Sequence, residues 1–385
     1  MNIELVLLSA SLFTWGIGEG MFFNFQPIYL QQLGADTLTI ALVFSLFGLA
    51  MLITHIPAGY LADRLGRKPV LVAAWTTGLL AAWVMALARS LPVFIVGMLL
   101  YGLTAFVSSP LNSYITAARG KLSLARAMTL ITAAYNLGAV FGPISGGWIG
   151  ERLGLRSVYL ISACIFIVST ILLLFLRSQP REIHDPAASP EKLRKNRHFV
   201  SFLGITFLVI FVMYLPQPLT PTFLQNERGL SLQNIGLLGS IGSLGNTLLA
   251  LLLGQFAART GFLLAQVSVA AFSLLLWKGI GLPWYALGFF LLGGYRSARS
   301  LIYAQVRPLI HSAQMGLAYG VVETFSSLAI MLAPLLAGVL YARQPGMVYW
   351  VSAGLMGGMV VVSTIFTSRQ TGSNDRGVVI APPEL

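Results

Sequence analysis

Residues 59–68 read Gly59-Tyr60-Leu61-Ala62-Asp63-Arg64-Leu65-Gly66-Arg67-Lys68 and lie between two long apolar runs. This stretch holds two glycines, one acid and three bases within ten residues. Glycine permits tight turns and lets helices approach closely, and the charged side chains need water. We therefore predict a sharp turn here, between two helices that cross an apolar layer.

Apolar runs like the two that flank this turn recur along the whole chain. Of its 385 residues, 56% are hydrophobic and only 9% are charged, whereas about 25% of the residues of a soluble domain are charged. A membrane-spanning helix needs about 20 apolar residues, and a span must satisfy its backbone hydrogen bonds internally. Because the runs are continuous and not alternating, we predict twelve transmembrane helices, over residues 5–31, 38–62, 70–88, 91–118, 126–150, 156–177, 200–225, 232–258, 262–279, 282–308, 315–341 and 346–368.

Two glycine-containing motifs lie in the first half of the chain. The first consists of Gly59, Asp63, Arg64, Gly66, Arg67 and Lys68, and the second of Gly138, Gly142, Pro143, Gly146 and Gly147. Together they resemble the helix 2–3 clamp and the antiporter signature of the major facilitator superfamily of secondary transporters. The resemblance implies an all-α membrane protein whose twelve transmembrane helices form two pseudo-symmetric six-helix bundles around a central cavity. It also implies that both motifs act in gating, with the clamp closing the cytoplasmic side when the transporter faces outward.

The net charge of +12 is distributed as in a membrane protein. With the N-terminus inside, sixteen of the 24 Lys and Arg residues fall in internal loops and termini, six fall outside, and two lie within a span. This bias obeys the positive-inside rule, so we expect both termini in the cytoplasm and the protein in the lipid bilayer of the inner membrane. The same bias explains the basicity without nucleic acid, which we do not expect as a partner.

A polar segment rich in proline and mixed charges divides the chain after Arg177. Three residues of the 59–68 turn recur 195 residues later, as expected of internal repeats. We predict an N-terminal bundle over residues 1–177, a cytoplasmic linker over 178–198, a C-terminal bundle over 199–368 and a disordered cytoplasmic tail over 369–385.

An acid lies in the middle of the first apolar run. An ionisable group in a membrane helix costs about 2.5–3.5 kcal/mol or more at the centre, so it is a functional candidate. Glu19 shares a helix face with Trp15, Phe22 and Gln26, and this mixture of aromatic and polar residues is typical of a cavity wall. Since apolar surroundings favour the neutral form of a carboxyl group, we predict that Glu19 exchanges protons and that this face contacts substrate. The alternative is a structural Glu19, hydrogen-bonded to a neighbouring helix.

Two arginines lie within the tenth run. Arg296, Arg299 and Tyr303 share one helix face, and arginine cannot give up its proton to relieve burial. The other acid placed deep in the second half is Glu323, so one of the two arginines has no acidic partner there. We predict that the two arginines and Tyr303 contact substrate and that Glu323 is a second candidate for proton coupling. The alternative is a structural Arg–Glu pair that joins two helices.

Other polar residues in the spans are weaker candidates. We also predict substrate contacts for Tyr101, Asn112, Tyr135 and Tyr214, although interhelical hydrogen bonds are the alternative. The single cysteine, Cys164, has no accompanying nucleophile or metal-ligating cluster, so we expect neither an enzyme nor a bound cofactor or metal.

These features predict a secondary transporter that couples proton movement to the export of amphipathic, drug-like small molecules. The two bundles would rock about the cavity by alternating access, and the resemblance implies a functional monomer. The alternative substrate is an organic anion or an acidic lipid-like molecule, bound by Arg296 and Arg299. Neither motif specifies the chemistry of the substrate, since both concern gating and packing.

Overall fold

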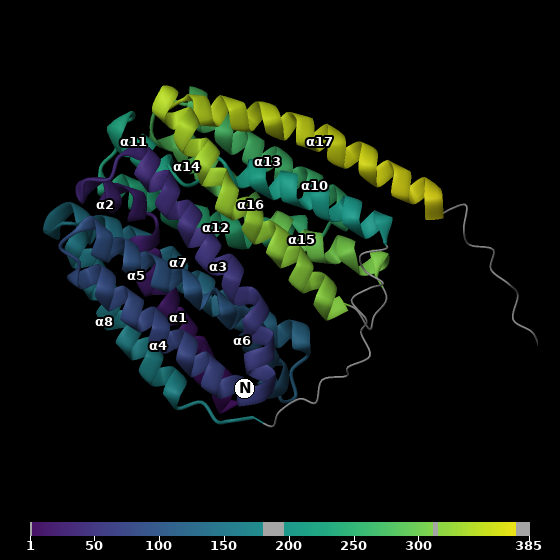
Figure 1. Cartoon of the computed structure of the whole chain (residues 1–385), viewed down its shortest axis with the longest axis horizontal. Coiled ribbons are helices and arrows are strands. Elements are labelled where there is room, and N and C mark those ends of the chain that lie inside the picture. The colour runs from purple at the N-terminus through teal and green to yellow at the C-terminus, as the bar shows by residue number, and fades with distance from the viewer. Residues whose placement is uncertain (1, 180–195, 311–314, 375–385) are drawn as a thin grey trace, which may run out of the picture.

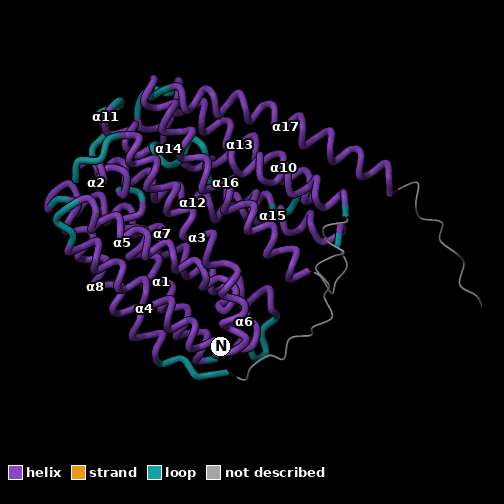
Figure 2. Tube along the Cα trace, in the orientation of Figure 1, coloured by secondary structure: helices purple, strands orange, loops and turns teal. Residues whose placement is uncertain are grey.

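Every regular element in the described part of the chain is a helix (Figure 2). The predicted linker lies largely outside the described residues, as do residues 375–385 of the predicted tail, while residues 369–374 continue the last helix. The computed structural model describes residues 2–179, 196–310 and 315–374, and it describes only the backbone of residues 55–65, 108–109, 124–125, 308, 315–317 and 366–374.

The first half of the chain forms one bundle, in which breaks divide two of the predicted spans. Asn24 and Phe25 separate the first span into a long and a short helix, and the fourth span contains a 3-10 turn. Pro27 lies at the start of the short helix, where its missing N–H is not needed. The elements are α1 (Ile3–Phe23), α2 (Gln26–Gln32), α3 (Thr37–Leu65), α4 (Arg67–Leu87), α5 (Leu91–Leu103), η1 (Thr104–Val107), α6 (Ser108–Ala118), α7 (Leu124–Leu153) and α8 (Leu155–Leu174).

The second half repeats this arrangement. Its first span also breaks, and the short helix that follows begins at Thr220, 194 residues after Gln26, again with a proline near its start. The tenth span breaks at Gly293. The elements are α10 (Arg197–Tyr214), α11 (Thr220–Asn226), α12 (Leu232–Leu253), α13 (Ala258–Lys278), α14 (Leu282–Leu292), α15 (Gly294–Val306), η2 (Arg307–Leu309), α16 (Met315–Arg343) and α17 (Met347–Asn374).

The described helices account for the predicted spans. Ten of them are long and apolar enough to cross a membrane individually, and the bent pair formed by α5 and α6, with an angle of 41°, supplies an eleventh candidate. The remaining predicted span corresponds to α14 and α15, and α15 carries the polar and charged residues of that span. The predicted all-α membrane fold is confirmed.

The two halves lie side by side and share a hydrophobic core at one end (Figure 1). There one buried cluster combines Phe25 and Leu30 of the first half with Leu219, Phe223 and Leu232 of the second. A second buried cluster contains residues of the second half alone. We call the end that carries α2 and α11 the closed end, and the opposite end, where α1 begins, the N-terminal end.

Four helices form the seam between the halves. α7 packs against α12, and α3 packs against α16. Hydrogen bonds also join the two halves. In the α7–α12 seam, Leu232 N donates to Glu151 Oε2 at 2.8 Å and Ile144 N to Ser240 Oγ at 3.1 Å, and between α11 and α2 at the closed end Asn226 Nδ2 donates to Gln31 Oε1 at 3.1 Å.

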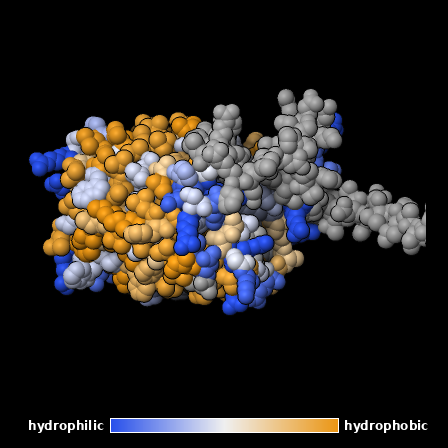
Figure 3. All heavy atoms as spheres, turned by 90° about the horizontal axis from the view of Figure 1, so that it is seen from below, coloured by the Kyte–Doolittle hydropathy of each residue, from blue (hydrophilic) through white to orange (hydrophobic). Residues whose placement is uncertain are grey.

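Many large hydrophobic side chains remain exposed on the outward faces of the helices, among them Leu42, Val168, Val267 and Val361. Figure 3 shows a broad area of hydrophobic residues on one face of the molecule, with hydrophilic residues to either side of it. Such a surface is stable where hydrocarbon replaces water, because the helices satisfy their own backbone hydrogen bonds. It agrees with a multi-pass membrane protein.

The sharp turn predicted within residues 59–68 occurs at Gly66. α3 continues through Leu65, and Gly66 then adopts a φ of 90°, a conformation that favours glycine. Arg67 begins α4, is buried, and donates to Gln179 Oε1 at 3.1 Å. The predicted clamp residues Gly59, Asp63 and Arg64 lie where only the backbone is described, so the gating role of the clamp, including Lys68, stays a prediction.

Candidate functional site

A cavity of about 850 Å³ lies between the two halves. It extends from Asn24 and Phe289 near the closed end to Ile115 and Ala250 toward the N-terminal end. Drug-sized ligands occupy pockets of roughly 300–1,000 Å³. The cavity is therefore large enough to enclose a small molecule between the bundles.

Glu19 lies in the first-half wall of this cavity, on α1. The Tyr135 hydroxyl of α7 donates to Glu19 Oε2 at 2.8 Å, and Trp15 and Tyr101 line the cavity beside it. Trp15 stacks on Phe166, with ring centroids 4.1 Å apart and planes inclined by 8°. Glu19 is thus partly exposed to the cavity, and the Tyr135 hydroxyl holds its carboxyl group in place.

The second-half wall carries an ion pair. Arg299 Nη2 of α15 lies 2.6 Å from Glu323 Oε2 of α16, and the Tyr303 hydroxyl donates to the other oxygen of the same carboxylate. Both charged side chains keep about a quarter to a third of their surface exposed, 31% for Arg299 and 26% for Glu323. The Arg–Glu pair considered from the sequence is therefore present, and its members still face the cavity.

Arg296 lies one turn before Arg299 and is exposed in the cavity. Its charge acts on Glu19 and Tyr135 across the gap between the halves. Two acids and two bases line the described cavity wall. When all four are ionised, their charges sum to zero. The second half contributes one surplus positive charge to the wall, and the carboxylate of the first half balances it. The charged wall residues are Glu19, Glu323, Arg296 and Arg299.

Most residues predicted to contact substrate or to exchange protons line this cavity. They come from both halves of the chain and meet there, although hundreds of residues separate some of them in sequence. The cavity brings together Trp15, Glu19, Tyr101, Asn112, Tyr135, Tyr214, Arg296, Arg299, Tyr303 and Glu323.

The structure places Phe22 and Gln26 outside the cavity wall. Phe22 is fully buried and packs edge-on against Tyr101, with ring centroids 5.4 Å apart. Gln26 is also buried, at the start of α2. The helical spacing that grouped both residues with Glu19 does not extend to Gln26, because α1 ends before it, and Phe22 belongs to the aromatic packing inside the first half.

Four amide residues of the cavity wall were not among the predicted contacts. They are Asn24, Asn136, Gln217 and Asn246, and all line the cavity. Asn24 and Gln217 lie at the breaks after α1 and α10, where the chain direction changes and a helical-face argument does not apply. The available signal was an amide side chain within an otherwise apolar run.

The second glycine motif lies in two different interfaces. Gly138, Gly142 and Gly146 face α1, where a Cβ atom would collide with backbone atoms of that helix. Gly147 faces α12 across the seam, and Pro143 contacts the same helix. Small residues allow such close helix contacts in membranes. The motif therefore lets α7 pack tightly on α1 within the first half and on α12 between the halves.

The chain forms two helical bundles around a cavity with polar and charged walls, and its outer surface is apolar. This is the architecture of a membrane carrier. The family model of the Major Facilitator Superfamily matches residues 8–306 and, in a second match, residues 205–379. The chain belongs to this superfamily, and it is a transporter and not an enzyme.

Named relatives and solved structures agree with this assignment. The chain is 27% identical over 370 residues to multidrug resistance protein MdtG of Citrobacter koseri, covering 89% of this chain and 90% of that protein. It is 22% identical over 357 residues to multidrug resistance protein 2 of Bacillus subtilis, covering 87% and 88%. The crystal structure of a variant of the nucleoside transporter NupG superposes with a TM-score of 0.81 at 17% identity, covering 94% of this chain and 99% of that one.

Proposed function

We propose that this transporter is a proton-coupled exporter of amphipathic, drug-like small molecules that acts as a monomer in the inner membrane. The observation that carries the proposal is Glu19, an acid partly exposed in the wall of a cavity of about 850 Å³. Trp15 and Tyr101 beside it offer aromatic surface, and a carboxylate next to aromatic rings suits a lipophilic cation. The relatives named multidrug resistance proteins support a substrate of this kind.

The conformation supports alternating access. The halves share a core and hydrogen bonds at the closed end, while the cavity extends toward the N-terminal end. The excess of Lys and Arg on the side of the N-terminus supports a cytoplasmic N-terminal end. In this orientation the cavity faces inward and accepts substrate from the cytoplasm. Release on the other side requires the α7–α12 and α3–α16 seams to part at the closed end.

A proton and a cationic substrate compete for Glu19 in this mechanism. With Glu19 ionised, the four charges of the cavity wall cancel, and a bound cation lies closer to the carboxylate than the charge of Arg296 across the gap. Protonation of Glu19 removes one negative charge, so the wall becomes net positive and repels the cation. Entry of a proton from the acidic side is thus coupled to release of the substrate there. One unit of pH difference supplies about 1.4 kcal/mol per proton.

Both glycine motifs act in gating under this proposal. When the N-terminal end closes, the clamp residues Asp63, Arg64, Arg67 and Lys68 hold the halves together there, as the resemblance to the superfamily implies. α7 stays packed on α1 through its three facing glycines, and its other face slides against α12 at Gly147. Glu323 takes part less directly, because it is already paired with an arginine.

One observation favours an anionic substrate as the second candidate. Arg296 is exposed in the cavity and belongs to the same wall as Arg299. An organic acid or an acidic lipid-like molecule would pair with these two arginines, with Glu19 protonated during binding. Guanidinium groups bind carboxylates and phosphates through parallel hydrogen bonds.

Binding and transport by the purified protein test these alternatives. Lipophilic cations and organic anions are added in detergent at pH 6 and pH 8, and thermal unfolding is followed. A ligand that binds only the folded protein at a hundredfold excess over its Kd stabilises it by about 2.7 kcal/mol. We expect cations to stabilise the wild type, more strongly at pH 8, and the Glu19→Gln variant to lose this response. Substrate-driven proton movement in proteoliposomes then shows the coupling.

The Arg296→Ala variant separates the two substrate classes. Under the cation proposal it retains cation binding, because Glu19 stays in place. Stabilisation by anions alone, abolished by Arg296→Ala, would contradict cation export and make the arginines the substrate site. Transport of cations by the wild type without any proton movement would contradict the coupling.

A further inference from the structure

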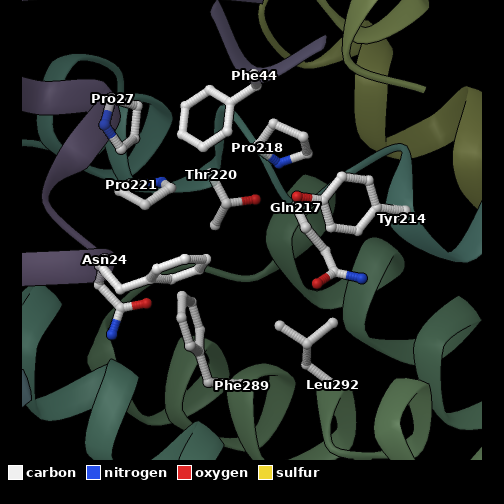
Figure 4. A pocket seen from close by; sticks show the side chains of 11 residues that line it. Asn24, Pro27, Phe44, Tyr214, Gln217, Pro218, Thr220, Pro221, Phe289 and Leu292 are labelled. Carbon is white, nitrogen blue, oxygen red and sulfur yellow. The ribbon is translucent and has the colours of Figure 1, made fainter. Parts of the chain in front are cut away.

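A second and smaller pocket lies beyond the central cavity at the closed end (Figure 4). Its volume is about 110 Å³. The wall that separates it from the central cavity is a single layer of side chains, which we call the partition. Six residues border both spaces and form this partition: Phe23, Asn24, Tyr214, Gln217, Phe289 and Leu292.

The pocket lies where the helix breaks of the two halves face each other. Pro27 and Pro221 line it and are 194 residues apart, and so are Phe23 and Gln217. Equivalent residues of two bundles related by a pseudo-two-fold axis lie on opposite sides of that axis. The pocket is therefore on the axis, in line with the central cavity, where a transported molecule must pass.

The chemistry of the pocket is neutral and largely apolar. Rings of Phe44 and Phe289 and several prolines face it (Figure 4), and its described lining contains no charged residue. Gln217 Nε2 donates to Met213 O at 2.8 Å, which leaves its amide oxygen to border the two spaces. Moving a charged group into such surroundings is costly. An apolar cavity of about 150 Å³ holds one benzene ring, so a pocket of about 110 Å³ accepts at most one ring, and only if a side chain of the partition moves aside.

We infer that the pocket receives an aromatic ring of the substrate while the charged end of the substrate stays at Glu19. The inference rests on the proposed function, because it takes Glu19 as the site of the charge. Glu19 and Phe23 are four residues apart on α1, which is about 6 Å along the helix axis. Because Phe23 belongs to the partition and the pocket lies beyond it, the site selects cations in which somewhat more than this distance separates the charge from the ring. The partition, and Phe289 in particular, limits the size of that ring.

A homologous series of ligands tests the spacing. Thermal unfolding of the full-length protein is measured with phenylalkyl-trimethylammonium ions whose alkyl linker grows by one methylene at a time. Every member has the same charge and the same ring, so only the distance varies. We expect the affinity to pass through a maximum at a charge-to-ring distance beyond about 6 Å and to fall for shorter and longer linkers.

Substitution of the partition tests the place of the ring. Phe289→Ala enlarges the pocket, and we expect it to shift the Kd ratio of phenyl to naphthyl compounds by about tenfold in favour of naphthyl, since a second ring then fills the space that the Phe289 side chain leaves. Phe290→Ala is the matched control, because the neighbouring ring borders neither space. If Phe289→Ala does not fold, Phe289→Leu makes a smaller change of the same sign.

Each outcome has a distinct meaning. Affinity that rises steadily with linker length, or an equal shift in Phe290→Ala, overturns the ring pocket while cation export stands, provided that binding still requires Glu19. If no cation of the series stabilises the wild type, cation export fails and the ring pocket fails with it. An optimum that persists in Glu19→Gln also overturns the inference, because the charge would then be held elsewhere.

Discussion

Replacing Gly147 by alanine places a methyl group in the seam between the two halves. A Cβ atom at this position would lie 2.6 Å from Leu232 O and 3.1 Å from the Cα atoms of Gln233 and Gly236. All three are backbone atoms of α12 or of the residues that begin it, and they cannot rotate away as a flexible side chain can. The collision is relieved only if α7 and α12 move apart at the closed end.

The steric strain at residue 147 should shift the equilibrium between conformations, because it is present only when the closed end is shut. Overpacking by one methyl group costs typically about 1–3 kcal/mol, and here the cost applies to the conformation in which the closed end is shut. The gain from replacing a helical glycine by alanine, about 0.5–1 kcal/mol, is common to both conformations and cancels. The equilibrium between them should shift by about 5- to 150-fold toward opening of the closed end.

A distance measurement across the closed end detects this shift. Spin labels are attached at Gln32→Cys and Glu227→Cys, two exposed residues of opposite halves, in a Cys164→Ala background. We expect the short-distance population to decrease in Gly147→Ala. Gly358→Ala is the matched control, because a Cβ atom there has no neighbour within 4 Å, and it should leave the distances unchanged.

Gly138 provides a second comparison, within one half. A Cβ atom there would collide with backbone atoms of Phe13 and Ile17 in α1, so Gly138→Ala should lower the thermal stability and leave the distance across the closed end unchanged. If Gly147→Ala also lowers stability and keeps the wild-type distances, the α7–α12 seam is not the surface that moves, and our reasoning is refuted.

Three further substitutions have defined outcomes. Glu151→Ala removes the carboxylate that accepts a hydrogen bond from the first turn of α12. The loss of this bond should weaken the closed end by about 1 kcal/mol and lengthen the same spin-label distance. Glu151→Gln should lengthen that distance less. Glu323→Gln leaves Arg299 without its ionic partner and should lower the free energy of unfolding by about 1–3 kcal/mol. An unchanged melting temperature would contradict this and show that water in the cavity solvates Arg299 as well as the carboxylate does. Trp15→Ala removes a ring stacked on Phe166 and should cost about 3–5 kcal/mol, with Trp15→Phe much milder if stacking is the cause.

The fold was largely predictable because hydrocarbon imposes a length and a composition on every span. The breaks within spans were not, because an apolar run reads the same whether the helix inside it is straight or broken. Pro27 and Pro221 gave a signal for two of the breaks, and the repeat of the halves now explains why they recur. The fourth span carries a 3-10 turn between α5 and α6 that no residue pattern indicated.

Residues of the site were predictable where an ionisable side chain lies within an apolar helix, because placing a charge there costs free energy. Glu19, Arg296 and Arg299 stood out for that reason, and all three line the cavity. The position of Gln26 was not predictable from helical spacing, because the spacing was extended past the end of α1. The proximity of Arg296 to Glu19 depends on which helices of the two halves face each other. A single sequence does not specify which helices pack together.

The cancellation of charge in the cavity wall has a consequence for the response of the carrier to voltage. A membrane potential does work only on net charge that moves through it, about 2.3 kcal/mol per elementary charge for each 100 mV. The empty cavity, with its two acids and two bases ionised, carries no net charge from one side to the other. In the proposed cycle, however, the carrier returns with Glu19 protonated. The outward step with a monovalent cation and the return step therefore each move one positive charge, in opposite directions, and the membrane potential does no net work on one exchange.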